Sequence, residues 1–330
     1  MHRSSLLERI KTVKDQDFTA LTLDIFCYQA ENNPVYRKFL QLLGIKQAQV
    51  QRIEDIPFLP IELFKKYELQ SAVWEPQQMF TSSGTTGDST SRHLVRDTVW
   101  YLENARRGFE HFYGDLKDYI VLALLPAYLE RKGSSLILMA QDFIEQSQTS
   151  LGGFFLYNQE ELIRHLQHIQ QAAPAAKVLL LGVSFALLDL AEAHPLDLHK
   201  VIIMETGGMK GRREEITRSE LHQQLKTAFQ QEHIHSEYGM TELFSQAYSP
   251  GEGLFFPAPT MRVLTREITD PLHLQAYERT GALNIIDLAN LDTISFIATE
   301  DLGKVYADGS FEILGRLDAS DVRGCNLMVV

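Results

Sequence analysis

The spacing of apolar residues predicts that the first part of the chain, residues 4–43, is helical. Apolar side chains there recur every three to four positions, which is the period of one helix face. The residues that show this period are Leu6, Leu7, Ile10 and Val13. Asn33-Pro34 interrupts the pattern, because the residue before a proline is driven out of the helical conformation. A shorter helix over 35–43, ending at Gly44, is expected to follow.

From residue 97 onward, apolar strand-like runs alternate with helical patterns. The expected strands span 119–125, 153–157, 177–181, 200–204 and 234–236. The expected helices span 98–113, 133–146, 158–172, 184–193 and 213–232, with Asp97 and Asn158 as caps of the first and third. Strands separated by helices predict a mainly parallel sheet joined by right-handed crossovers. The fold class is therefore α/β.

The pattern changes beyond Tyr248, where shorter strands are separated by glycine turns. These strands are expected at 261–265, 283–287, 294–298, 304–307 and 311–314. We therefore predict two parts: an α/β core with its helical N-terminal region over 1–248, and a smaller β-rich lobe over 249–330.

Composition narrows the classes of partner. The 330 residues are 45% hydrophobic and carry a formal net charge of −12, with no block of lysine and arginine. This balance argues against nucleic acid and anionic membrane as partners. Two cysteines, Cys27 and Cys325, give no disulfide framework, and no apolar run approaches the roughly 20 residues of a membrane span. A cytoplasmic protein is the expectation.

One loop consists only of glycine, serine and threonine and follows a strand-like Met79-Phe80. Its residues are Thr81, Ser82, Ser83, Gly84, Thr85, Thr86 and Gly87. Small side chains leave the backbone N–H groups accessible, and the glycines let these groups curl into a concave anion site. The loop is typical of polyphosphate binding, although a plain surface loop has the same composition.

Three further segments lie at the predicted carboxyl ends of strands, where α/β sheets bind ligands. They are Gly182-Val183-Ser184, Gly207-Gly208-Met209, and Tyr238-Gly239-Met240-Thr241-Glu242. Thr241-Glu242 taken alone would also suit the N-cap of a helix.

The order of these motifs resembles the adenylate-forming superfamily of acyl-CoA ligases, peptide-synthetase adenylation domains and luciferases. The residues that carry the resemblance are Thr81–Gly87, Tyr238–Glu242, Thr299-Glu300-Asp301-Leu302-Gly303 and Gly315-Arg316-Leu317-Asp318. Ser91-Arg92 after the loop and the ending Ser320–Cys325 are similar to the acyl-protein synthetases of bacterial bioluminescence fatty-acid reductase systems. Because five residues follow Cys325, we expect the large-domain fold of the superfamily without its mobile C-terminal lid domain.

The resemblance implies a chemistry of ATP and Mg²⁺. The 81–87 loop would hold the β- and γ-phosphates, Thr241 would donate to the α-phosphate, and Glu242 would bind Mg²⁺. Asp301 would accept from the ribose hydroxyls, and Arg316 would reach ribose or phosphate. The adenine would lie between Gly207-Gly208-Met209 and Tyr238.

The resemblance further implies a fatty acyl group that is loaded as a thioester on Cys325 and passed to an acyl-reductase partner. Arg323 lies two residues away and would favour the thiolate. An isolated cysteine is otherwise most often a small buried apolar residue. An adenylating enzyme of the acyl-CoA ligase type, with another acceptor, is the nearest alternative.

Two readings from other classes stay open. Gly182-Val183-Ser184-Phe185-Ala186 approaches the nucleophile elbow of serine hydrolases and acyltransferases, and it would need one of four histidines as its base. These histidines are His222, His233, His235 and His273. More simply, Ser184 would cap the helix that it begins, and residues 177–190 would line an acyl pocket. The remaining reading is a non-catalytic nucleotide-binding subunit. No histidine spacing, including His165-x-x-His168, indicates a metal site.

Overall fold

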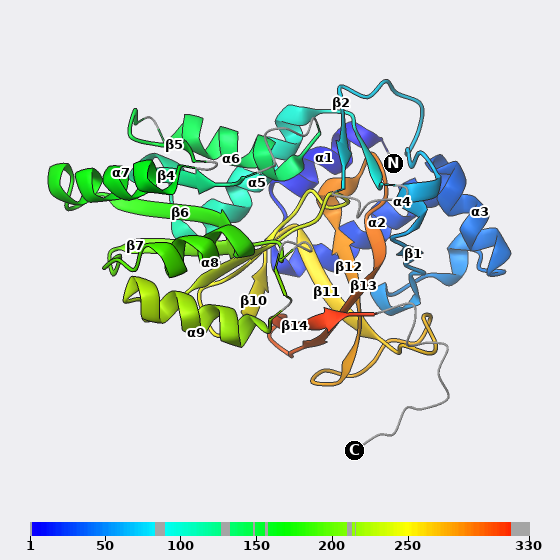
Figure 1. Ribbon diagram of the computed structural model, residues 1–330. Coiled ribbons are helices and arrows are strands. Elements are labelled where there is room, and N and C mark those ends of the chain that lie inside the picture. Colours follow the sequence, from blue (N-terminus) through cyan, green and yellow to red (C-terminus); the bar gives the residue numbers. More distant parts are fainter. Residues whose placement is uncertain are drawn as a thin grey trace, which may run out of the picture.

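The computed structural model describes residues 2–82, 90–126, 133–147, 149–155, 158–209, 213–214 and 216–317. Within these ranges, twelve strands form one mixed sheet, and two more form a separate hairpin. Helices cover the sheet, as Figure 1 shows. Since a mainly parallel half continues into an antiparallel half, the α/β class predicted from the sequence is confirmed.

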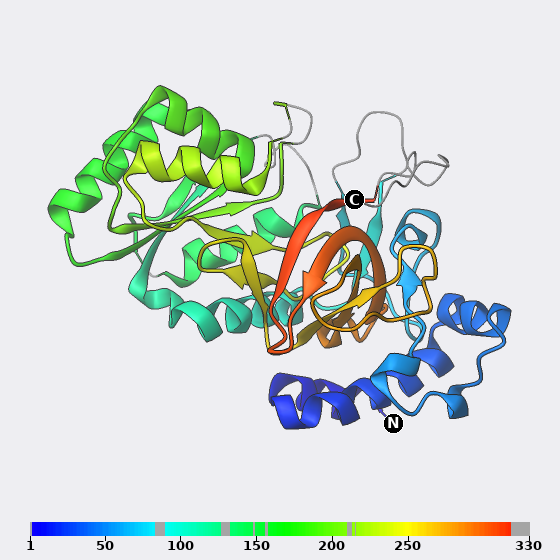
Figure 2. The same ribbon diagram turned by 90° about the horizontal axis from the view of Figure 1, so that it is seen from below.

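The N-terminal region is helical, as its apolar period predicts. It contains α1 (Arg3–Lys11), α2 (Asp15–Asn32) and α3 (Pro34–Leu42), followed by the short 3-10 helices η1 (Gln47–Gln49) and η2 (Ile53–Asp55). Asn33 ends α2 and caps α3 by accepting a hydrogen bond from the Tyr36 backbone N–H at 3.0 Å. In both views these helices lie beside the antiparallel strands, away from α7, α8 and α9 (Figures 1 and 2).

Buried side chains attach these helices to a distant loop. Gln29 on α2 donates to the carbonyl oxygens of Asn290 and Leu291, both at 3.1 Å. Asn33 donates to the Thr293 carbonyl at 3.0 Å, and Arg3 forms a two-pronged ion pair with Asp292 at 2.5 and 2.6 Å. The 290–295 loop is thereby fixed from the N-terminal side.

Five strands form the parallel half of the sheet, in the order β8-β7-β6-β4-β5. They are β4 (Tyr119–Leu124), β5 (Gly153–Phe155), β6 (Lys177–Val183), β7 (Val201–Thr206) and β8 (His235–Tyr238). The connecting helices are α5 (Thr98–Tyr113), α6 (Ser135–Gln146), α7 (Gln159–Ala172), α8 (Ser184–Ala193) and α9 (Arg218–Phe229), with η3 (Leu116–Asp118) after α5. Asp97 and Asn158 cap α5 and α7 as predicted.

The antiparallel half continues the same sheet through β9 (Ala247–Ser249) and β10 (Leu254–Pro257). Beyond them come β14 (Phe311–Arg316), β13 (Phe296–Val305), β12 (Thr280–Asp287) and β11 (Met261–Arg266). The short β1 (Leu59–Pro60) adds to β13, and α4 (Leu63–Lys66) and η4 (Leu288–Asn290) complete the elements. The hairpin of β2 (Gln78–Thr81) and β3 (Arg92–Val95) brackets the glycine-rich loop. The division at residue 248 stays a prediction.

Three sequence-based expectations are wrong in detail. The strands expected at 294–298 and 304–307 are one strand, β13, because Gly303 lies within it rather than in a turn. A Cβ at Gly303 would collide with the Glu312 carbonyl of β14, so glycine permits close strand approach there. The helix expected over 213–232 is shorter. Thr217 and Glu220 cap the start of α9, and Gln230, with a left-handed φ of +52°, ends it.

The third correction concerns Ser184, which the sequence predicts as the N-cap of the helix that it begins. Strand β6 runs through Val183, and α8 begins at Ser184, so Val183 occupies the N-cap position and the serine hydroxyl does not cap the helix.

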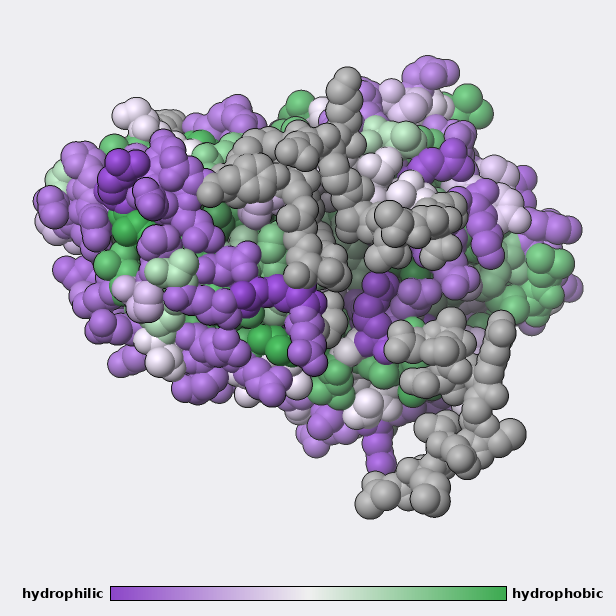
Figure 3. Space-filling view, viewed as in Figure 1, coloured by the Kyte–Doolittle hydropathy of each residue, from purple (hydrophilic) through white to green (hydrophobic). Residues whose placement is uncertain are grey.

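On the face shown in Figure 3, hydrophilic residues predominate and apolar residues are scattered among them. In the part of the chain that the structure describes, every helix is too short or too polar to cross a bilayer.

Candidate active site

Three segments that are far apart in sequence share one cavity at the carboxyl ends of β7 and β8. The cavity has a volume of about 110 Å³ and is called the site cavity below. Five of the residues predicted from sequence line it: Thr81, Gly207, Gly239, Met240 and Thr241. The end of β2, the end of β7 and the segment after β8 therefore meet where the sequence analysis expected a nucleotide.

Other residues of the site cavity were not predicted. They include Tyr101, Ser134, Leu136, Met139, Glu237 and Gln246. Glu237 directly precedes the recognised motif, so its position at a strand end could have indicated it. Ser134 is the cap of α6. Tyr101 and Met139 lie inside helices, where apolar spacing indicates only core.

The segment 239–246, called the motif turn below, is held by buried polar side chains from distant elements. His93 on β3 contacts the Thr241 carbonyl through Nδ1 at 2.8 Å and the Thr293 hydroxyl through Nε2 at 3.0 Å. A carbonyl only accepts, so Nδ1 carries the proton and Nε2 accepts from Thr293. Burial lowers the pKa of His93 to about 4, which keeps the ring neutral. His93 thus positions Thr241.

Three further side chains complete this support. Asn290 donates to the Glu242 carbonyl at 2.7 Å, and Asn104 donates to the Phe244 carbonyl at 3.0 Å. Asp287 accepts from the backbone N–H groups of Phe244 and Ser245, at 2.7 and 2.9 Å. The motif turn is a turn and not the start of a helix, so the N-cap interpretation of Thr241-Glu242 is wrong. Buried hydrogen bonds of this kind fix a backbone in advance of ligand binding.

Glycine is required at two positions beside the site cavity. A Cβ at Gly239 would collide with the carboxylate of Glu237. Gly133, with a left-handed φ of +89°, accepts from the Thr81 N–H at 2.9 Å, and a Cβ there would come within 2.7 Å of the Met79 carbonyl oxygen. The close approach of Gly133 joins the end of β2 to the start of α6.

Tyr238, Asp301 and Arg316 form a second cluster next to the motif turn. The Tyr238 hydroxyl donates to Asp301 at 2.7 Å, and Arg316 Nε lies 3.4 Å from the other Asp301 oxygen. Asp301 and Arg316 are register partners on β13 and β14. Burial raises the pKa of Asp301, while the bond from Tyr238 and the charge of Arg316 oppose the rise. The tyrosine ring is itself buried and packs edge-on against Phe255.

Glu242 is a buried carboxyl group without an ion-pair partner within 4 Å in the described part of the chain. Burial raises its pKa, and a hydrogen bond with Ser91 and the charges of Arg316 and Lys65 oppose the rise. A buried carboxylate that lacks a cation fits a metal ligand. Among the described residues, no three potential protein ligands lie close enough together to enclose a metal. A single carboxylate still suits Mg²⁺, which takes few protein ligands when it also binds phosphates.

The remaining predicted site residues are placed as follows. Gly208 is partly exposed and adjoins Gly207, but the Met209 side chain is buried in the core and does not line the site cavity. Ser82 pairs with Ser91 through backbone and hydroxyl bonds of 3.2 and 2.9 Å. Ser83, Gly84, Thr85, Thr86, Gly87 and Cys325 lie outside the described residues.

The alternative nucleophile, Ser184, is buried in a different polar cluster. Its hydroxyl donates to Glu205 at 2.9 Å, and His222 lies 3.6 Å from the other Glu205 oxygen. The histidine therefore faces the carboxylate and not the serine, which is the wrong order for a nucleophile and its base. Residues of α8 such as Phe185, Leu187 and Leu188 belong to the core and do not line the site cavity.

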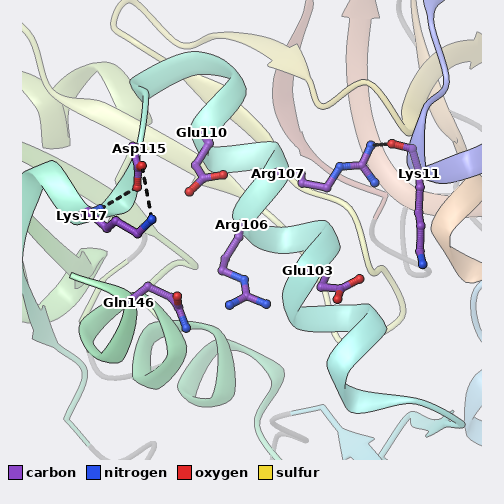
Figure 4. Close-up of a pocket in the computed structure, with 8 residues that line it drawn as sticks. All are labelled: Lys11, Glu103, Arg106, Arg107, Glu110, Asp115, Lys117 and Gln146. Atoms are coloured by element: carbon purple, nitrogen blue, oxygen red, sulfur yellow. Dashed lines mark hydrogen bonds and ion pairs between the residues drawn. The ribbon is translucent and has the colours of Figure 1, made fainter. Parts of the chain in front are cut away.

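A larger cavity of about 500 Å³ lies elsewhere, between α1, α5, η3 and α6. This charged groove is lined by Lys11, Glu103, Arg106, Arg107, Asp115 and Lys117, among others. Figure 4 shows these side chains and the contact between Lys117 and its neighbour Asp115, which measures 3.8 Å. None of the predicted motif residues reaches the charged groove. Its volume alone therefore does not make it the site.

Comparison with solved structures shows which known fold the chain has. The structure is similar to 2-hydroxyisobutyryl-CoA ligase in complex with 2-HIB-AMP and CoA, with a TM-score of 0.68 at 14% identity over 94% of this chain and 71% of that one. It is also similar to ATP-bound MatB from Rhodopseudomonas palustris, with a TM-score of 0.53 at 16% identity over 72% of this chain. The chain has the adenylate-forming ligase fold. It spans about half of MatB, 47% of that chain.

Sequence comparison adds nothing to this assignment. No protein-family model and no curated protein sequence matches the chain. The likeness is therefore one of fold, and the chemistry is inferred from the residues of the site.

Proposed function

We propose that the protein activates a carboxylic acid with Mg·ATP and forms an acyl-adenylate. One observation carries the proposal: Thr81, Gly207 and Thr241, from three separate segments, line one cavity in a chain with the adenylate-forming ligase fold. In the similar 2-hydroxyisobutyryl-CoA ligase, the bound species are 2-HIB-AMP and CoA.

The reaction requires positioning and charge neutralisation. A carboxylate oxygen bonds to the α-phosphorus while the bond from that phosphorus to the bridging oxygen breaks, and pyrophosphate leaves with the electron pair. Thr241, whose carbonyl is held by His93, would present its hydroxyl to the α-phosphate. Glu242 would hold Mg²⁺, which supplies neutralisation of the phosphate charge. The 81–87 loop would bind the β- and γ-phosphates.

The cluster of Tyr238, Asp301 and Arg316 would serve the nucleoside. Asp301 has carboxylate oxygens that accept from hydroxyl groups, so it would bind the ribose, and Arg316 would lie beside ribose or phosphate. Gly207 and Gly208 have no side chains, so the flat adenine ring would lie against their backbone. Because Tyr238 is buried and Met209 faces the core, we assign them to shaping this edge of the site.

For the second half-reaction we propose transfer of the acyl group to Cys325, as the resemblance implies, with an acyl reductase as the protein that receives it. The thiolate sulfur would bond to the acyl carbon while AMP leaves. CoA is the alternative acceptor. Intact-protein mass spectrometry after incubation with ATP and acid tests the cysteine. An acyl adduct that persists in Cys325→Ser contradicts this role.

The proposed adenylation is tested by acid-dependent exchange between ATP and labelled pyrophosphate. Thr241→Val removes one hydroxyl and should reduce the exchange rate about 100-fold. Thr227→Val, on the exposed face of α9, removes a hydroxyl that bonds only within its own helix and is the matched control. If ATP binds but no acid supports exchange, the protein is a nucleotide-binding subunit and the enzyme proposal fails.

A further inference from the structure

The site cavity is small for a long acyl chain. Its volume of about 110 Å³ is below the roughly 150 Å³ of an apolar protein cavity that holds benzene. A fatty acyl chain has more than twice as many carbon atoms as benzene. A nucleotide that contacts Thr81, Gly207 and Thr241 from outside the enclosed space would leave that space to the acid, which would then need a short carbon skeleton.

The lining of the site cavity combines apolar side chains, such as Leu136 and Met139, with one buried carboxyl group, that of Glu237. Glu237, on β8, is 7% exposed and lies at the boundary of the cavity. One of its oxygens accepts from the Thr206 hydroxyl, and the other lies against Gly239. Within the described residues Glu237 forms no ion pair. A carboxylate accepts about four hydrogen bonds, and within the described part of the chain Thr206 supplies one to Glu237.

A second acceptor of the site cavity is also unsatisfied. Gln246 is 3% exposed, and its Nε2 donates to the Phe244 carbonyl at 3.3 Å, which identifies the other atom as the oxygen. This oxygen has no hydrogen-bond partner in the described part of the chain. Because this oxygen is fully buried, a ligand in the site cavity does not reach it, and Glu237 at the boundary is the acceptor that such a ligand would meet.

Provided that the site performs the adenylation proposed above, we propose that its acid is short and carries a hydroxyl or ammonium group that donates to Glu237. Burial raises the pKa of Glu237 to about 7, which agrees with a carboxyl group that lacks a cationic partner in the unliganded protein. A hydroxyl would donate to either protonation state, whereas an ammonium would favour the ionised one. The inference opposes the fatty acyl chain implied by the family resemblance.

The experiment compares matched acids in the pyrophosphate exchange assay on the full chain. Hydroxy acids and amino acids of about three to five carbon atoms are each paired with the unsubstituted acid of equal length, and palmitate is added. We expect kcat/KM to be about 100-fold or more higher for a donor-bearing acid than for its unsubstituted partner, because a buried acceptor rejects a ligand that leaves it unpaired.

Two substitutions identify the donor. Glu237→Met removes the acceptors and should reduce the preference below about tenfold for either donor. Glu237→Gln keeps an acceptor but removes the charge, so a preference for a hydroxyl should persist and one for an ammonium should be lost. Glu145→Met and Glu145→Gln, on the exposed face of α6, are the controls. Circular dichroism confirms that each variant is folded.

The two possible failures are distinguishable. Exchange that is supported equally by unsubstituted acids, or best by palmitate, overturns this inference and leaves adenylation standing. Exchange with none of the acids, measured on protein that binds ATP by calorimetry, overturns the proposed function and this inference together.

Discussion

The site cavity and the charged groove differ in the contacts that hold their polar side chains. Around the motif turn, His93, Asn104, Asp287 and Asn290 are buried and bond to a backbone far away in sequence. In the charged groove, Lys117 pairs with Asp115, two residues away, and both side chains are more than half exposed. The charged groove also has longer-range contacts, from Arg107 to the Lys11 carbonyl and from Arg106 to Asp142, but none of them holds a predicted motif residue. Buried side chains that bond to a distant backbone, rather than volume, mark the place where the geometry is fixed.

The largest effect is expected from Asp287→Ala. The substitution leaves the N–H groups of Phe244 and Ser245 buried without acceptors, and it should lower the free energy of unfolding by about 4 kcal/mol. Urea unfolding measures the change. Asp270→Ala, which removes an exposed carboxylate that accepts from Leu272 N at 3.2 Å, should cost less than about 1 kcal/mol. Equal losses for the two variants would remove the contrast between the cavities.

Glu242→Gln tests whether Glu242 contributes to the reaction or to the stability of the fold. We expect the acid-dependent exchange rate to fall about 100-fold, because a neutral amide binds Mg²⁺ poorly, while the free energy of unfolding stays within about 1 kcal/mol of the wild-type value. The half-exposed Glu267→Gln serves as the control. A variant that loses stability but keeps its exchange rate would show that Glu242 is structural.

His93 makes the motif turn sensitive to acid. The folded protein keeps His93 neutral down to about pH 4, whereas the unfolded chain binds a proton near its ordinary pKa of 6.5. The free energy of unfolding should therefore fall as the pH drops from about 6.5 to 4, by about 3 kcal/mol from this residue. In His93→Gln this fall should be smaller by that amount.

The pH experiment requires the difference between wild type and variant. His235, with a pKa of about 4, adds to the fall. Glu237, with a pKa of about 7, opposes it, because burial disfavours its ionised form and this cost disappears as the pH drops below 7. His199→Gln, at an exposed histidine, is the control. Parallel curves for wild type and His93→Gln would contradict the buried neutral imidazole.

The smallest effect is expected in the charged groove. Lys117→Gln should change the free energy of unfolding by less than about 0.5 kcal/mol, because exposed ion pairs contribute little. The exchange rate should equal that of wild type. A tenfold loss of exchange would give the charged groove a role that its exposed contacts do not indicate.

Local signals predicted much of the fold. Asp97 and Asn158 cap their helices because a short polar side chain before an apolar period satisfies free N–H groups locally. The predicted strand boundaries around Gly303 were wrong. The sequence does not distinguish a glycine that permits close strand packing from a glycine in a turn.

The site was predictable only where it rests on consecutive residues. The run 238–242 was recognised, and the structure brings Thr241 to the same cavity as Thr81. Glu237 directly precedes this run, so its position could have indicated it. His93 acts through contacts with segments that are distant in sequence, and no local period indicates such contacts. Isolated polar residues of this kind become visible only when the fold is known.

The attachment of α2 to the 290–295 loop also affects the position of Thr241 in the candidate site. Gln29 and Asn33 form hydrogen bonds with this loop. The Thr293 hydroxyl of the loop bonds to His93, and His93 bonds to the Thr241 carbonyl. An expression clone trimmed to start after α3 would therefore discard part of the scaffold that orients the reacting groups, although no residue in the deleted stretch touches them. We therefore expect such a truncation to abolish activity although the reacting groups are still present.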